Sequence, residues 1–203
     1  MPRFTPEELR LLADAQFFAT KSRLMGRVRG LLEETHAALR AEVAAAALTT
    51  PDGFNPAKVQ FVKGEHLEDC PYQYLDFPKH FAGGETFTFR TLFWWGHAFV
   101  FALLLEGDQL RQYKQNLVNR YHQVAGRELE MSLAPSLWEW KQGAGYTIPI
   151  THDHKSQISA VLSGRRSVKL ARFVSLGDPA VQEGRVAEIA VQTFRALLPV
   201  ITT

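Results

Sequence analysis

Two histidines in the segment Thr151-His152-Asp153-His154 form the densest group of metal-ligand side chains in this sequence. In extended backbone, side chains two residues apart point to the same side, so His152 and His154 can provide two ligands to a divalent metal. A third ligand would have to come from elsewhere in the chain, and the candidates are His66, His80, His97, Glu65 and Asp76. The alternative is a purely structural role, in which Asp153 caps a following helix, both histidines are exposed and no cofactor is bound.

A second group of residues has the composition of a ligand pocket. The aromatic run from Phe93 to Trp95 follows Arg90, and an irregular segment from Glu65 to His80 carries two tyrosines between prolines. Ligand sites combine apolar walls with a few convergent polar groups. We therefore predict a pocket for a small anionic ligand, lined by Tyr72, Tyr74, Arg90 and His97.

Arg90 itself can be satisfied in two ways. A buried guanidinium needs either a carboxylate partner or an anionic ligand. The neighbouring segment supplies acids for an internal ion pair, namely Glu65, Glu68, Asp69 and Asp76. Both outcomes remain open from the sequence.

Three shorter motifs have ordinary explanations beside the functional ones. Cys70 can be a nucleophile only if a histidine approaches it. Glu139-Trp140-Lys141 is similar to half of a nuclease metal motif, but no acidic partner can be placed. Gly164-Arg165-Arg166 is a basic turn that can bind an anion or simply be solvated. The motifs of P-loop, dinucleotide-binding, serine-hydrolase and zincin proteins do not occur in the chain.

Composition restricts the partners and the compartment. The 203 residues carry 23 basic and 21 acidic side chains, which gives a net charge of +2. With so small an excess of positive charge, we expect no nucleic-acid partner. The longest apolar run, Leu92 to Leu105, is broken by Gly96 and His97 and is too short to span a membrane as a helix. The N-terminus has no apolar signal core, and the single cysteine excludes an internal disulfide. We expect a cytoplasmic protein with no membrane partner.

The elements that must position these residues follow from periodicity. Apolar residues at helical spacing predict a helical N-terminal segment at about 5–48, opened by the capping box Thr5 to Glu8. Strict alternation at 86–105 predicts a long aromatic hairpin, whose second strand is apolar on both faces and therefore central in its sheet. Residues 64–84 show no clean period and are expected to be irregular. A terminal helix follows Asp178-Pro179.

These elements predict one α+β domain, residues 1–203, in which a mainly antiparallel sheet built around the hairpin is packed by the N-terminal and C-terminal helices. The segments Pro71 to Pro78 and Phe89 to Gly96 resemble a pattern in uncharacterised bacterial proteins of hypothetical function. The resemblance covers about residues 70–107, implies a bacterial source, and assigns no catalytic residue.

Two functions remain. The first is a non-catalytic binding or interaction protein that self-associates as a homo-oligomer, because large aromatic side chains crowd the hairpin and are enriched at subunit interfaces. The alternative is a metal-dependent, hydrolase-like enzyme that uses His152 and His154. Whether the chain is an enzyme is left undecided by its residues.

Overall fold

The aromatic hairpin forms the centre of the structure, a computed structural model that describes residues 3–203. Strands β3 (Glu85–Trp94) and β4 (Ala98–Glu106) are antiparallel and pair Phe93 with Phe99 beside the turn. The sheet has seven strands in the order β1-β2-β3-β4-β7-β5-β6, and every pairing is antiparallel. The prediction that the second hairpin strand is central is confirmed, because β4 is the fourth strand of the seven.

The remaining elements surround this hairpin. The other strands are β1 (Gln60–Leu67), β2 (Cys70–Ala82), β5 (Glu130–Ser132), β6 (Thr147–Pro149) and β7 (Ser167–Ser175). The helices are α1 (Pro6–Leu12), α2 (Ala15–Ala45), α3 (Leu110–Asn119), α4 (Tyr121–Val124), α5 (Lys155–Ser163), α6 (Pro179–Gln182) and α7 (Val186–Ile201). The predicted α+β class, with helices from both ends of the chain packed on the sheet, is confirmed.

The expectation of an irregular segment at residues 64–84 is wrong. These residues form the second half of β1 and all of β2, a hairpin that adds two strands to the edge of the sheet. The alternation is hidden because a bulge shifts the register between Asp76 and Lys79, beside the cis Phe77–Pro78 peptide bond. A proline is tolerated at a bulge because no ladder N–H is needed there.

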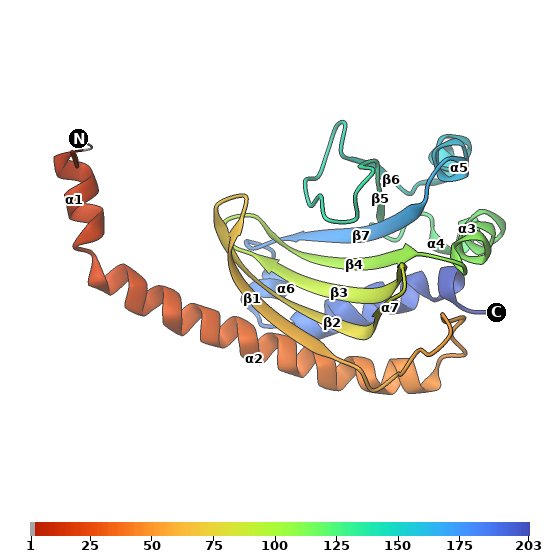
Figure 1. Ribbon diagram of the computed structural model, residues 1–203, viewed down its shortest axis with the longest axis horizontal. Coiled ribbons are helices and arrows are strands. Elements are labelled where there is room, and N and C mark those ends of the chain that lie inside the picture. Colours follow the sequence, from red (N-terminus) through yellow and green to blue (C-terminus); the bar gives the residue numbers. More distant parts are fainter. Residues whose placement is uncertain (1–2) are drawn as a thin grey trace.

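The two faces of the sheet are covered differently. One face packs against α2 and α7, where Phe87, Phe89, Phe99 and Phe101 are buried in the main core. Phe89 meets Phe194 of α7 edge to face, with ring centroids 5.4 Å apart. The opposite face carries a smaller cluster beneath the long loop at residues 133–146, which is visible above β7 in Figure 1. The loop covers only part of this face.

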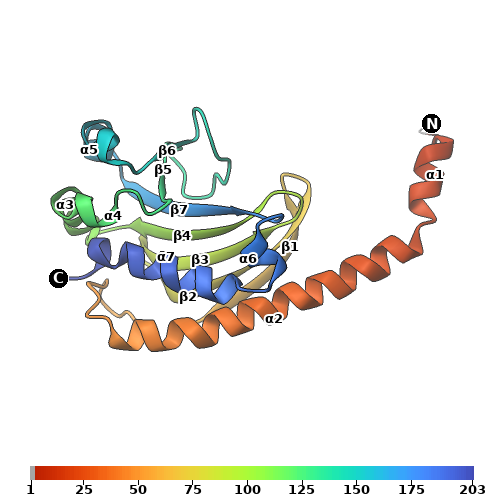
Figure 2. The same ribbon diagram turned by 180° about the vertical axis from the view of Figure 1, so that it is seen from behind.

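Helix α1 and the first residues of α2 extend beyond the body of the molecule. The capping box at Thr5 and Glu8 opens α1, and Asp14 caps α2 through the Phe17 N–H. Residues 3–19 are all exposed, and we call this segment the N-terminal arm. Figures 1 and 2, which view the molecule from opposite sides, both show the arm projecting away from the sheet. Along residues 3–203, no helix has both the length and the apolar character required to cross a membrane.

Candidate ligand pocket

A pocket of about 460 Å³ lies on the partly covered face of the sheet, between β1–β3 and the 133–146 loop. This volume is in the range of sites for small organic ligands. Its walls are mainly aromatic, and they come from Tyr72, Tyr74, Phe81, Trp138 and Trp140. Its polar side chains are Gln60, Asp76, Lys79 and Arg90.

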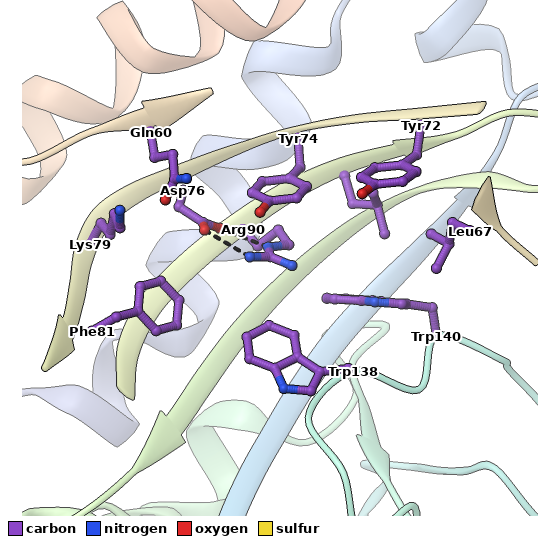
Figure 3. Close-up of a pocket in the computed structure, with 11 residues that line it drawn as sticks. Gln60, Leu67, Tyr72, Tyr74, Asp76, Lys79, Phe81, Arg90, Trp138 and Trp140 are labelled. Carbon is purple, nitrogen blue, oxygen red and sulfur yellow. Dashed lines mark hydrogen bonds and ion pairs between the residues drawn. The ribbon is translucent and has the colours of Figure 1, made fainter. Parts of the chain in front are cut away.

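Strand β2 supplies the tyrosine wall. Tyr72 and Tyr74 are two residues apart and therefore point to the same face of the sheet. Their rings are nearly parallel, with a 6° angle between planes and centroids 6.1 Å apart (Figure 3). Gly64 lies opposite Tyr72 in β1, and a Cβ atom at this glycine would lie only 2.3 Å from the tyrosine Cζ. The ring is thus seated directly on the glycine backbone.

The 133–146 loop supplies the tryptophan wall. Trp140 is buried in the smaller cluster, whereas Trp138 is 52% exposed and lies beside Phe81, with centroids 6.2 Å apart. Lys169 of β7 holds this loop, because its Nζ donates to the carbonyl oxygens of Leu137, at 3.1 Å, and Glu139.

The environment of Lys169 is unusual for a lysine. The side chain is buried, and its ammonium lies 4.3 Å from the centre of the Trp140 ring. Burial disfavours the charged form and lowers the pKa of Lys169 to about 8. The carbonyl oxygens and the ring face are the groups that stabilise the remaining charge.

An ion pair between Arg90 and Asp76 forms the floor of the pocket. These residues are cross-strand neighbours in β2 and β3. Nε and Nη2 of Arg90 each donate to one carboxylate oxygen at 2.7 Å, and the side chains are only 6% and 1% exposed. The guanidinium carbon lies 3.7 Å from the Tyr74 ring centre. Both Asp76 oxygens are thereby engaged, while the third guanidinium nitrogen, Nη1, is left free of this carboxylate.

Lys79 gives the pocket its net charge. It lies in β2 just after the bulge, is half-buried, and has its Nζ 5.6 Å from the Phe81 ring centre. Lys79 forms no ion pair with any residue in the described range 3–203. Because Arg90 and Asp76 neutralise each other, this ammonium makes the pocket positive and suited to an anionic group.

Three of the four residues predicted to bind a ligand lie together here: Tyr72, Tyr74 and Arg90. His97 lies elsewhere, exposed at the β3–β4 turn, where it stacks on Trp94 with centroids 3.7 Å apart. Its Nε2 lies 3.9 Å from Cys70 Sγ, so a histidine does approach the single thiol. Phe93 and Trp94 are buried inside the chain itself, and self-association through the hairpin stays a prediction.

The histidine pair has a different geometry from the one predicted. His152 to His154 form a 3₁₀ helix rather than extended backbone, and successive residues of such a helix are rotated by about 120°, so the two side chains diverge. His154 Nδ1 lies 2.9 Å from the Pro149 carbonyl oxygen and 3.0 Å from Thr151 Oγ1. Within residues 3–203, no three His, Cys, Asp or Glu side chains are grouped as a metal site.

Five further polar or aromatic residues that line the pocket were not predicted from the sequence, namely Gln60, Lys79, Phe81, Trp138 and Trp140. The available signal was the two-residue spacing of Trp138 and Trp140, which in extended chain can place both rings on one side. The Glu139-Trp140-Lys141 tripeptide is explained differently from a nuclease motif, because Lys141 pairs with Glu68 at 2.8 Å and the Glu139 carbonyl accepts from Lys169.

Comparison of the chain with protein-family models, curated proteins and solved structures finds no match. The resemblance to bacterial proteins of hypothetical function is thus neither supported nor contradicted, and it stays a prediction.

Proposed function

We propose that this protein binds a small organic anion with a planar apolar part, and that the aromatic pocket is its binding site. The observation that carries the proposal is the combination, in one open pocket, of five aromatic side chains with the ammonium of Lys79, which has no ion-pair partner among residues 3–203. Aromatic faces bind flat apolar groups, and a lysine or arginine donor fixes the orientation of an anion.

The two parts of the ligand have distinct positions. The planar part is expected to lie against the exposed Trp138 and the neighbouring Phe81, since the Arg90 guanidinium already covers the Tyr74 ring at 3.7 Å from its centre (Figure 3). The anionic group is expected at Lys79, with the free Nη1 of Arg90 as a second donor. Removing the exposed Trp138 surface from water favours binding by about 25 cal/mol per Å² of apolar area.

The position and hydrogen bonds of Asp76, the acid in the pocket, favour binding without catalysis. A general base must come within hydrogen-bond reach of the proton that it takes from the substrate. The Asp76 side chain is only 1% exposed and accepts hydrogen bonds from Arg90 at both oxygens, so it is suited to holding the arginine. We place this binding function in the cytoplasm, and the support is the single Cys70, which leaves no internal disulfide.

The test uses 2-naphthoate and its neutral analogue 2-naphthamide, with binding measured by calorimetry and by quenching of tryptophan fluorescence. The wild-type chain is expected to bind naphthoate about tenfold more tightly than naphthamide, since a charge-assisted hydrogen bond contributes about 1.5 kcal/mol or more. Lys79→Met should abolish this preference, and Trp138→Ala should weaken both ligands. Lys155→Met, which removes an exposed lysine on α5, is the matched control and should bind as the wild type does.

Two results would contradict the proposal. If neither compound binds, the pocket is not a site for this ligand class. If Lys155→Met lowers naphthoate affinity as much as Lys79→Met does, the preference reflects overall charge and not the pocket.

A further inference from the structure

Buried charge is unbalanced on the pocket face of the sheet. Among residues 3–203, the buried side chains of the Asp, Glu, Lys and Arg types are those of Asp76, Arg90 and Lys169, and all three lie on this face. Because Arg90 and Asp76 neutralise each other, the positive charge of Lys169 has no buried counter-ion. Burying an uncompensated charge is costly, and a buried amine responds in part by losing its proton.

The surroundings of Lys169 leave its charge open to outside influence. No carboxylate among residues 3–203 forms an ion pair with it. Burial is the main cause that lowers the pKa of Lys169, and of the charged groups that face it, Glu139 in the loop raises this pKa whereas Arg90 on β3 lowers it. Strand β4 presents the apolar Leu104 opposite Lys169, and Glu130 of β5 is engaged by side chains of the loop and of β6. A further charge added on this face should therefore change the protonation of Lys169.

The ring of Trp140 connects Lys169 to the pocket. Its centre lies 4.3 Å from Lys169 Nζ and 5.5 Å from the guanidinium carbon of Arg90, and the ring lines the pocket beside that arginine (Figure 3). Trp140 is itself buried, so water is largely excluded between the two cations. Charges about 10 Å apart interact appreciably in such an environment. An anion held by Arg90 is thus close enough to act on Lys169.

We propose that Lys169 is a proton-linked cation of the pocket, so that an anion bound against Lys79 and Arg90 draws a proton from solvent onto the Lys169 amine. This inference rests on the proposed function and adds a regulation of the same site by pH. A negative charge favours the protonated form of a nearby amine. Linkage requires the reciprocal effect, in which protonation of Lys169 strengthens anion binding. Affinity for an anion should therefore fall as the pH rises through the pKa of Lys169, about 8.

The first test measures proton uptake by calorimetry with 2-naphthoate at pH 8. The titration is performed in Hepes and in Tris, because the difference between their ionisation enthalpies converts the observed heats into the number of protons taken up. The wild-type chain is expected to take up about 0.3 proton per naphthoate and to bind it about threefold more weakly at pH 9 than at pH 7. Neutral 2-naphthamide should bring no proton, because it adds no charge to the pocket.

Two variants assign the proton to Lys169. Lys169→Arg keeps a cationic donor that does not titrate near pH 8, so both the proton uptake and the pH dependence should be lost. Glu139→Gln removes the acid that favours the ammonium, and the midpoint of the pH dependence should move to lower pH. Its amide oxygen can still accept the Lys141 N–H, which in the wild type donates to the Glu139 carboxylate.

Lys114→Met is the matched control. The pKa of this lysine is also lowered by burial, but it lies on α3, does not line the pocket and donates to the Arg165 carbonyl. The variant should take up a proton with naphthoate as the wild type does. Circular dichroism of all the variants verifies that the fold is retained.

The possible failures are distinguishable. Naphthoate binding with no proton uptake at pH 8, or with an uptake that Lys169→Arg retains, would overturn this inference and leave the proposed function standing. An unchanged midpoint in Glu139→Gln would overturn it as well. Absence of naphthoate binding would contradict the proposed function and this inference together.

Discussion

Arg90 is at once a pocket residue and a structural one, because its charge is buried and balanced by Asp76 alone among the acids that the sequence offered. The other candidates lie elsewhere, with Glu65 paired to Lys21 and Glu68 paired to Lys141. Burying two charges costs desolvation free energy that their attraction must offset. The contribution of the pair therefore depends on both partners being present.

Removing one partner should be far more damaging than removing both. Arg90→Met leaves an unpaired carboxylate in the sheet and is expected to lower the free energy of unfolding by about 3–5 kcal/mol. Arg90→Met combined with Asp76→Val should recover most of this loss, because apolar residues replace both charges. Urea denaturation of the three proteins measures the difference, and a loss below about 1 kcal/mol for Arg90→Met would show that the pair is not held as described.

At the scale of elements, the β1–β2 hairpin shapes the pocket through one close contact. Tyr72 lies over Gly64 in the neighbouring strand, where no side chain can be added without moving the ring. The position of the tyrosine wall thus depends on a residue that does not itself line the pocket. A substitution there can alter the pocket by displacing Tyr72, although Gly64 does not line the pocket.

Gly64→Ala is expected to displace Tyr72, lower the free energy of unfolding by about 1–3 kcal/mol and reduce naphthoate affinity. Gly30→Ala in α2 is the matched control, because a Cβ there meets nothing within 4 Å and alanine favours the helix. Denaturation and calorimetry of the two variants provide the comparison. Equal effects of the two alanines would contradict the close contact.

At the scale of the whole molecule, stability should be greatest in the middle of the sheet and least at its edge. Strand β4 is hydrogen-bonded to β3 and β7, and most of its side chains are buried. Strand β1 is paired on one side only and is largely accessible. Amides of β4 therefore open only when the molecule unfolds extensively, whereas those of β1 can open locally.

Native-state hydrogen exchange followed by mass spectrometry should accordingly show the slowest exchange at residues 99–105. Peptides from residues 60–67 are expected to exchange faster under the same conditions. Faster exchange in β4 than in β1 would show that the sheet does not have β4 as its centre.

The residues themselves determined the class of fold and the central hairpin. Alternation at 86–105 depends only on local backbone geometry, since successive side chains of a strand point to opposite faces. The capping box at Thr5 is likewise local, and the structure contains it. Two faces of apolar residues on β4 required cover on both sides, and the helices and the 133–146 loop supply it.

Tertiary structure alone decided which side chains share a pocket. Trp138 lies 5.2 Å from the Arg90 guanidinium carbon because Lys169, on a strand paired to β4, holds the carbonyl of the preceding loop residue, and this hydrogen bond joins residues 32 positions apart in sequence. For His152 and His154, tertiary structure separated side chains that the sequence had predicted to converge. Their spacing predicted convergence, but a 3₁₀ backbone turned them apart. Spacing fixes direction only when the backbone conformation is known, and in short polar segments that conformation is set by packing against distant elements.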